Sequence, residues 1–127
     1  ILHPSLMGED SAPRPGEVAL AALAGCIIQI IMWNSALYDV PIDDVTVNVR
    51  GRHELVSMFD TSAGWPGDVD VVVEIHVKTT EPEKFEKYIM PHIAEKSPVA
   101  QTFVKPIPLK WVVAVNDRRR QERYVVS

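Results

Sequence analysis

Cys26 is the single cysteine of this 127-residue chain, and it is the first candidate for chemistry. A thiolate attacks electrophiles and is oxidised, whereas a buried neutral thiol behaves as a small hydrophobic group. The segment around Cys26, from Val18 to Trp33, contains no charged residue, so an activating cation must come from elsewhere in the fold. A single cysteine also excludes an internal disulfide and a cysteine-rich zinc site, and it favours a reduced, cytoplasmic setting.

The other residues whose side chains could take part in catalysis or metal binding do not have the spacing of a known motif. Four histidines are present: His3, His53, His76 and His92. None has the spacing of a metal-binding helix pair, so we expect surface or structural roles for them. Asp43 and Asp44 open a predicted strand and are expected to face solvent. Because there is also no glycine-rich phosphate loop and no Ser/His/Asp spacing, we expect neither a metal nor a cofactor.

Two further groups of side chains allow two interpretations. The basic run Arg118–Arg120 follows a predicted turn and is expected at a solvated hairpin tip, with contact to an anion or substrate as the alternative. The three tryptophans are expected in the core, and lining a pocket is the alternative for them. They are Trp33, Trp65 and Trp111.

Composition predicts one soluble domain with its own core. Hydrophobic residues make up 46% of the chain and charged residues 24%, with a formal net charge of −4. The acidic balance argues against nucleic-acid binding, which depends on phosphate neutralisation. The apolar run from Val18 to Trp33 includes Gln29 and falls short of the about twenty residues that cross a bilayer, so we expect a core helix and no membrane.

Periodicity predicts an extended arm, a long helix and then strands. A proline-containing arm leads to a helix that begins near Pro15, has Glu17 in its first turn and ends at about Tyr38, before Pro41. Because this helix is apolar almost all round, we expect it to be buried on most sides. Alternating apolar and polar residues predict two strands, at 42–53 and 69–79, around a loop at 58–68 that contains Trp65.

The second half of the chain predicts shorter elements. A second helix opens at Glu81 and its expected apolar stripe consists of Phe85, Tyr88, Ile89, His92 and Ile93. A short helical piece runs from Ser97-Pro98 to about Phe103, and strands at 109–115 and 122–126 flank a turn at Asn116-Asp117. The predicted fold class is therefore α+β, with antiparallel sheets around a long central helix.

Two motifs in the chain resemble those of the OsmC/Ohr family, the osmotically inducible protein C-like and organic hydroperoxide resistance proteins. PGEVALAALAGC, from Pro15 to Cys26, resembles the family helix PxELLLAALAGC. KSPVAQTF, from Lys96 to Phe103, is similar to the family motif xCPVxxTL. The predicted strands and second helix follow in the family's order, and the resemblance covers roughly residues 12 to 113.

The resemblance implies an intertwined homodimer with active sites at the subunit interface. It also implies a peroxiredoxin-like thiol peroxidase that detoxifies organic hydroperoxides under oxidative stress. Cys26 is then the peroxidatic cysteine, whose thiolate attacks the peroxide and becomes a sulfenic acid. In the family, the cysteine of the second motif resolves this acid as a disulfide.

The chain departs from the family pattern at three places. Ser97 stands at the resolving position, so an intramolecular disulfide cannot form. Family members carry a β-region before the first motif, with an activating arginine in the hydroperoxide reductases; here an arm ending at Arg14 precedes the motif, and Arg14 is the candidate. The family glutamate that pairs with this arginine maps onto Gly16, one residue before Glu17.

A predicted C-terminal hairpin at about 111–126 lies beyond the usual end of the family pattern. We expect residues 1–127 to form a single domain in which this hairpin takes the sheet positions of the missing N-terminal strands. Arg14, or an arginine of the 118–120 run, is then expected to approach Cys26.

The sequence is compatible with two functions. The first is a one-cysteine hydroperoxide reductase whose sulfenic acid is resolved by an external thiol. The second is a catalytically degenerate dimer that binds a small apolar ligand or acts as a scaffold. Cys26 and the Pro98-Val99 motif favour the enzyme, whereas Ser97 and the displaced arginine–glutamate pair favour the binding protein.

Overall fold

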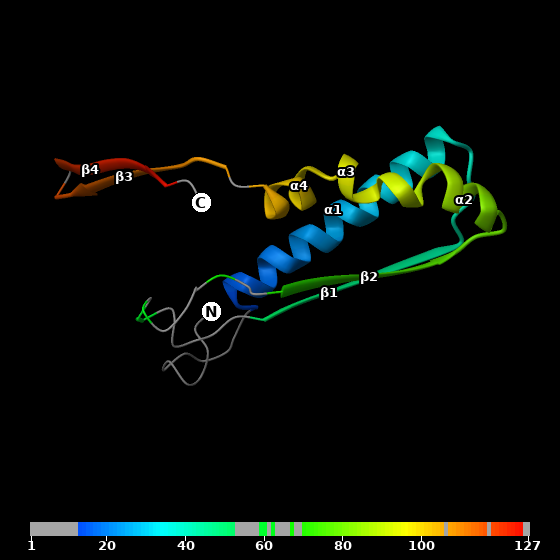
Figure 1. Cartoon of the computed structure of the whole chain (residues 1–127), viewed down its shortest axis with the longest axis horizontal. Helices are drawn as coiled ribbons and strands as arrows, with labels where there is room; N and C mark the ends of the chain where they lie inside the picture. Colours follow the sequence, from blue (N-terminus) through cyan, green and yellow to red (C-terminus); the bar gives the residue numbers. More distant parts are fainter. Residues whose placement is uncertain are drawn as a thin grey trace.

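The protein has an α+β fold with antiparallel strand pairs, as predicted (Figure 1). The computed structural model describes residues 13–52, 59, 60, 62, 67, 70–105, 107–116 and 118–125. The helices are α1 (Pro15–Leu37), α2 (Pro82–Tyr88), a 3₁₀ turn (Met90–His92), α3 (Ile93–Lys96) and α4 (Pro98–Val104). The strands are β1 (Asp44–Arg52), β2 (Asp70–Lys78), β3 (Leu109–Val115) and β4 (Arg118–Val125).

Helix α1 has the ends that the sequence predicts. Pro15 occupies its first turn, where a missing N–H costs nothing. Glu17 accepts hydrogen bonds from the backbone N–H of Arg14 at 3.3 Å and from its guanidinium at 2.9 Å, which closes the first turn. After Leu37 the chain turns away through Asp39, which has a positive φ of 56° that aspartate tolerates better than most residues.

Strands β1 and β2 form an antiparallel ribbon with one half-buried face. Val47 lies opposite Ile75 and Val49 opposite Val73 in the register. The alternate β1 residues Thr46 and Asn48 are exposed, so the predicted period of two is confirmed for β1. The predicted loop between the strands, with Trp65, lies largely outside the described residues.

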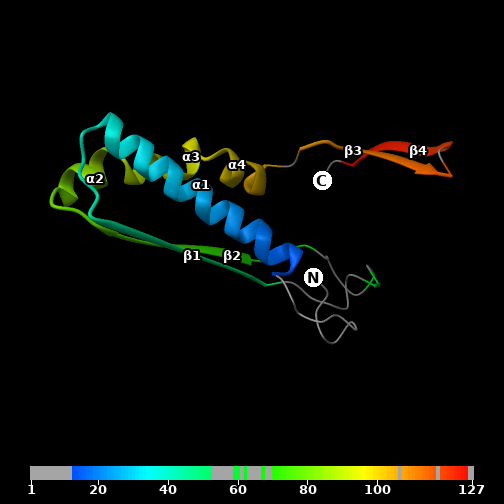
Figure 2. The same cartoon turned by 180° about the vertical axis from the view of Figure 1, so that it is seen from behind.

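Helix α1 lies between the β1–β2 ribbon on one side and α3 and α4 on the other (Figures 1 and 2). This layering buries a small apolar core, and α2 closes it near the C-terminal end of α1. The buried members of the core are Leu23, Ile27, Ile31, Val40, Phe85, Ile89, Ile93 and Ala100.

The segment predicted as one second helix is divided into three short pieces. Pro91 has no N–H to continue the helical hydrogen bonds, so α2 gives way to a 3₁₀ turn before α3 begins. Phe85, Ile89 and Ile93 of the predicted stripe are buried, whereas Tyr88 and His92 are exposed. The helical piece after Ser97 forms α4 as predicted.

The expectation that α1 is buried on most sides is wrong for the single chain. Val18, Met32, Trp33 and Leu37 are exposed, with Trp33 at 62% and Leu37 at 71%. The ribbon and α3–α4 are too small to cover the whole circumference of this apolar helix. By length and composition α1 could also cross a membrane, a test that a core helix passes as well.

The β3–β4 hairpin extends away from the body of the protein beyond α4 (Figures 1 and 2). Its turn contains Asn116 at a φ of 52°, and a bulge interrupts the pairing between Val113 and Ala114. β4 starts at Arg118, which pairs with Val115 directly beside the turn, so the backbone of the basic run lies at the turn end of the hairpin, as predicted. The hairpin forms a two-stranded sheet separate from β1–β2, and its expected place in the sheet of the domain stays a prediction.

Candidate functional site

Cys26 of α1 and Ser97, at the start of α4, lie in direct contact. The Ser97 hydroxyl donates a hydrogen bond to the Cys26 sulfur, with an Oγ–Sγ distance of 3.0 Å across 71 residues of sequence. Ser97 is fully buried, at 0% exposure, while Cys26 is half-buried. The fold therefore brings together the two residues that correspond to the cysteine pair of the predicted motifs.

The position of Ser97 follows from its role as the N-cap of α4. Its backbone is extended, with φ −87° and ψ 114°, and Pro98 begins the helix. The Ser97 oxygen accepts a hydrogen bond from the backbone N–H of Ala100 at 3.1 Å. A serine hydroxyl has one hydrogen, so the capping bond leaves the O–H free to point at the Cys26 sulfur.

Cys26 lies at the border between the packed and the uncovered faces of α1. Leu23, Ile27 and Ile30 are buried, whereas the neighbouring Gly25 and Gln29 are exposed. A methyl group added at Gly25 would meet nothing within 4 Å. The surface of α1 beside Cys26 is therefore uncovered on the Gly25 side within one chain.

Arg14 and Glu17 form a second polar pair, at the N-terminus of α1. Their side chains make an ion pair of 2.9 Å and are about half exposed. At 1.5 Å per helical residue, Arg14 lies about 18 Å along the axis from Cys26, which exceeds the length of its side chain. Within one chain, the structure brings Arg14 to Glu17 and Cys26 to Ser97 but does not unite the two pairs.

The other arginine candidates lie outside what can be placed. The backbone of Arg118–Arg120 is described, but the side chains of these residues are outside the described part of the structure. Their approach to Cys26 stays a prediction.

A half-buried polar contact that sequence reasoning missed lies beside Ser97. The Lys96 amine donates to the Asn34 side-chain oxygen at 2.6 Å, and the Asn34 amide donates to the Ile30 carbonyl at 2.8 Å. The same amine lies 5.4 Å from the ring of Tyr38. These contacts attach the end of α3 to α1 and so help to hold Ser97 against Cys26. The sequence carried one signal for this contact, because Asn34 is a polar residue in a largely apolar helix.

The histidines that can be placed lie on the surface in pairs with glutamates. His76 Nε2 is 2.7 Å from Glu74, and His92 Nδ1 is 3.0 Å from Glu95. The hydrogen bond and charge of His76 hold the pKa of Glu74 below its ordinary value of 4.5, with a smaller contribution from Arg50. His3 and His53 are outside the described residues.

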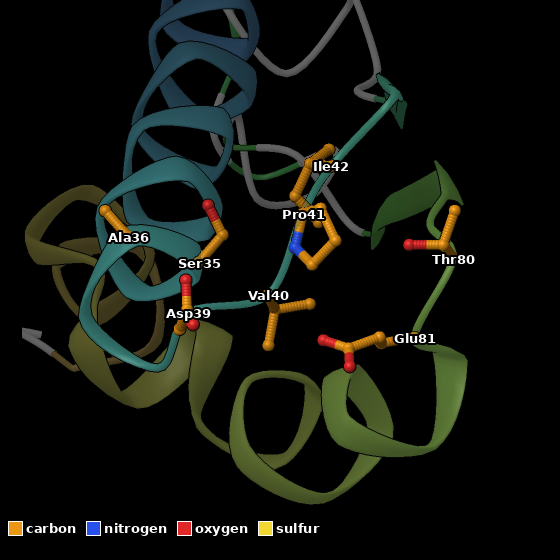
Figure 3. Close-up of a pocket in the computed structure, with 8 residues that line it drawn as sticks. All are labelled: Ser35, Ala36, Asp39, Val40, Pro41, Ile42, Thr80 and Glu81. Atoms are coloured by element: carbon orange, nitrogen blue, oxygen red, sulfur yellow. The ribbon is translucent and has the colours of Figure 1, made fainter.

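Among the described residues, no group of three His, Cys, Asp or Glu side chains could hold a metal ion. An open hollow of about 780 Å³ lies where the C-terminal end of α1 meets the start of α2 (Figure 3). Its lining includes Ser35, Asp39, Pro41, Thr80 and Glu81 but not Cys26. The hollow is therefore separate from the thiol.

Comparison with known proteins is consistent with this arrangement. A family model described as OsmC-like protein matches residues 8–112. The fold is similar to an OsmC-like protein from Mycoplasma pneumoniae, with 14% identity and a TM-score of 0.63, over 76% of this chain and 67% of that one. It is also similar to an OsmC-like hydroperoxide resistance protein from Jannaschia sp. CCS1, with 15% identity and a TM-score of 0.64, over 94% of this chain and 75% of that one. No curated protein matches the chain significantly.

Proposed function

Because the chain belongs to the OsmC-like protein family, we propose that it is a one-cysteine thiol peroxidase that reduces organic hydroperoxides at the expense of an external thiol. The observation that carries this proposal is the contact of a half-buried Cys26 with the Ser97 hydroxyl. The substrate class is supported by the structural likeness to a protein described as a hydroperoxide resistance protein.

The first half of the proposed reaction oxidises Cys26. Its thiolate attacks the outer oxygen of the hydroperoxide ROOH, so that an S–O bond forms while the O–O bond breaks. The sulfur gives up two electrons and becomes a sulfenic acid. The alkoxide leaves and takes up the proton released when the thiol ionised, which yields the alcohol ROH.

The second half reduces the enzyme with two external thiols, because Ser97 carries no sulfur. One thiol R′SH attacks the sulfenic sulfur, which releases water and leaves a mixed disulfide on Cys26. A second R′SH displaces the Cys26 thiolate and departs as R′SSR′. The sum is ROOH + 2 R′SH → ROH + H₂O + R′SSR′.

A second copy of the chain is the proposed partner that completes the site. The uncovered face of α1, with Val18, Trp33 and Leu37, is apolar, and so are many of the exposed side chains of β3. Leu109, Val112, Val113 and Val115 are the exposed apolar residues of that strand. The hairpin extends away from its own α1, so exchange between two copies would let each hairpin cover the other copy's helix.

A ligand-binding protein without turnover is the second candidate. It is favoured by the separation of the Arg14–Glu17 pair from Cys26 within the chain and by the hydroxyl at position 97. Such a protein would hold a small apolar molecule against α1 and leave peroxide unchanged.

Peroxide consumption separates the two candidates. Cumene hydroperoxide is mixed with dithiothreitol and with either the wild type or Cys26→Ser, a variant of nearly equal size that cannot be oxidised to a sulfenic acid. The proposed enzyme predicts peroxide loss well above background for the wild type alone. Equal background rates for both proteins would end the enzyme proposal in favour of the binding protein.

A further inference from the structure

We propose that Ser97 is a positioning residue for Cys26, whose hydroxyl orients the sulfur by donating a hydrogen bond to it in place of supplying a resolving thiol. This inference rests on the proposed function, since an oriented thiolate matters for a nucleophilic Cys26. It assigns an active role to the position at which the chain departs from its family motif.

The direction of the hydrogen bonds supports a donor role. Ala100 N–H donates to the Ser97 oxygen, and the Ser97 O–H donates to the Cys26 sulfur. Successive donors aligned in this way polarise one another, so the O–H is a stronger donor than an isolated hydroxyl. A donor of this kind favours the anionic sulfur, because hydrogen bonds to charged acceptors are the stronger ones.

The surroundings make this donor effective. Ser97 has no exposed surface, so water does not compete for its hydroxyl. The side chains of Arg14 and Lys96 are engaged with Glu17 and Asn34, respectively. In the part of the chain that the structure describes, the Ser97 hydroxyl is the group that donates to the Cys26 sulfur.

A positioning role has a pH signature that a packing role lacks. Stabilising the thiolate raises its fraction at neutral pH, but it also lowers the intrinsic nucleophilicity of the sulfur. Loss of the hydroxyl should therefore slow attack near neutral pH and leave it equal or faster at high pH, where every thiol is ionised. A loosened fold would instead change reactivity in one direction across the whole pH range.

The test measures the alkylation rate of Cys26 by iodoacetamide between about pH 5 and pH 10. Ser97→Gly removes the hydroxyl, and glycine at an N-cap costs only a few tenths of a kcal/mol relative to serine. Ser97→Thr keeps the hydroxyl and is the rescue variant. Thr102→Gly, at an exposed position within α4, weakens the same helix without touching the sulfur and is the matched control.

We expect Ser97→Gly to alkylate about three- to fourfold more slowly near neutral pH, with the midpoint of the rate profile about one pH unit higher, because the greater nucleophilicity of the sulfur offsets part of the loss of thiolate. At the alkaline plateau its rate should equal or exceed that of the wild type. Ser97→Thr should restore the wild-type midpoint, and Thr102→Gly should keep it. If Ser97→Gly does not fold, Ser97→Asp replaces it, because aspartate caps helices well but presents an acceptor to the sulfur, and the same upward midpoint is expected.

An unchanged midpoint in the folded variant, or the same change in Thr102→Gly, would overturn the positioning role. Peroxide consumption by the wild type is measured separately. A wild type that consumes peroxide while the midpoint is unaffected by Ser97→Gly contradicts this inference alone. A wild type that consumes none, with the midpoint moved, contradicts the peroxidase proposal and leaves the thiolate contact supported.

Discussion

Two polar pairs on α1 differ in both sequence separation and exposure. Arg14 and Glu17 are one helical turn apart, about half exposed, and close the first turn of the helix. Cys26 and Ser97 are 71 residues apart, and Ser97 is fully buried. The first pair needs only the helix to form, whereas the second needs α4 packed on α1. The local pair stabilises the end of the helix, whereas the contact at which we propose the chemistry takes place depends on the whole fold.

We expect the largest effect from Ser97→Cys, which places a second thiol beside Cys26. The 3.0 Å contact between Oγ and Sγ is close enough for Ser97→Cys to form a disulfide with Cys26 after small side-chain adjustment. Treatment with one equivalent of hydroperoxide should leave no free thiol in the variant and no adduct with the external thiol. Thiol titration and intact-mass measurement check this outcome.

Thr102→Cys is the matched control, since it adds a thiol to the exposed surface of the same helix. It should retain free thiol and give no intramolecular disulfide. A Ser97→Cys protein that stays reduced, or that forms disulfides only between molecules, would show that the contact does not persist in solution.

The next effect concerns the uncovered face of α1 and the proposed second copy. Trp33→Glu places a charge in the proposed interface and should raise the dimer dissociation constant about 30-fold or more, as expected for a buried aromatic anchor. Sedimentation equilibrium measures this constant. Met90→Glu changes a residue that is similarly exposed but lies outside α1, and should leave the dimer intact. A monomeric wild type, or equal loss in both variants, would contradict the exchanged hairpins.

A smaller effect is expected at the local pair. Arg14→Ala removes the ion pair with Glu17 and should lower the free energy of unfolding by about 0.5 to 1 kcal/mol, because exposed pairs and helix ends contribute little. The alkylation rate of Cys26 should stay within about twofold, since Arg14 is too distant within the chain. Urea denaturation and alkylation measure the two quantities. If Cys26 of Arg14→Ala were alkylated tenfold more slowly, Arg14 would have to act on Cys26, and a second copy of the chain would have to bring it within reach.

The smallest effect is expected on the outer face of the ribbon. The pKa of Glu74 is lowered mainly by the hydrogen bond from His76, so this contribution to stability is present above the ordinary value of 4.5 and is lost as pH falls through the folded-state pKa. Glu74→Gln should therefore flatten the decline in stability between about pH 5 and pH 3. His76→Gln should flatten it similarly, and urea denaturation across this range measures both. If the decline in stability with falling pH were unchanged in both variants, the contact between Glu74 and His76 would not contribute to the free energy of unfolding.

The elements of the body were largely predictable because their signals are local. Pro15, Glu17 and Pro41 mark the ends of α1, and alternating residues such as Val45, Thr46 and Val47 mark β1. The division at Pro91 was also readable, but the apolar stripe around it favoured a continuous helix. Burial of α1 was overestimated because hydropathy records that a face is apolar and not what covers it.

The site was predictable only in part. The proximity of Cys26 and Ser97 followed from a resemblance between motifs, since no local pattern links residues 71 positions apart. The contact of Lys96 with Asn34 was missed for the same reason, because its partners are 62 residues apart. Within one chain the length of the helix separates Arg14 from Cys26, so the approach of Arg14 to the thiol stays a prediction for a second copy of the chain.

The most direct test of the central claim is to find where one equivalent of cumene hydroperoxide leaves its oxygen. The wild type is treated in the absence of external thiol, trapped with dimedone and mapped by peptide mass spectrometry. We predict stoichiometric loss of peroxide and a dimedone adduct on Cys26. Dithiothreitol added after the peroxide but before the dimedone should prevent this adduct. Unreacted peroxide together with an unmodified Cys26 would contradict the account.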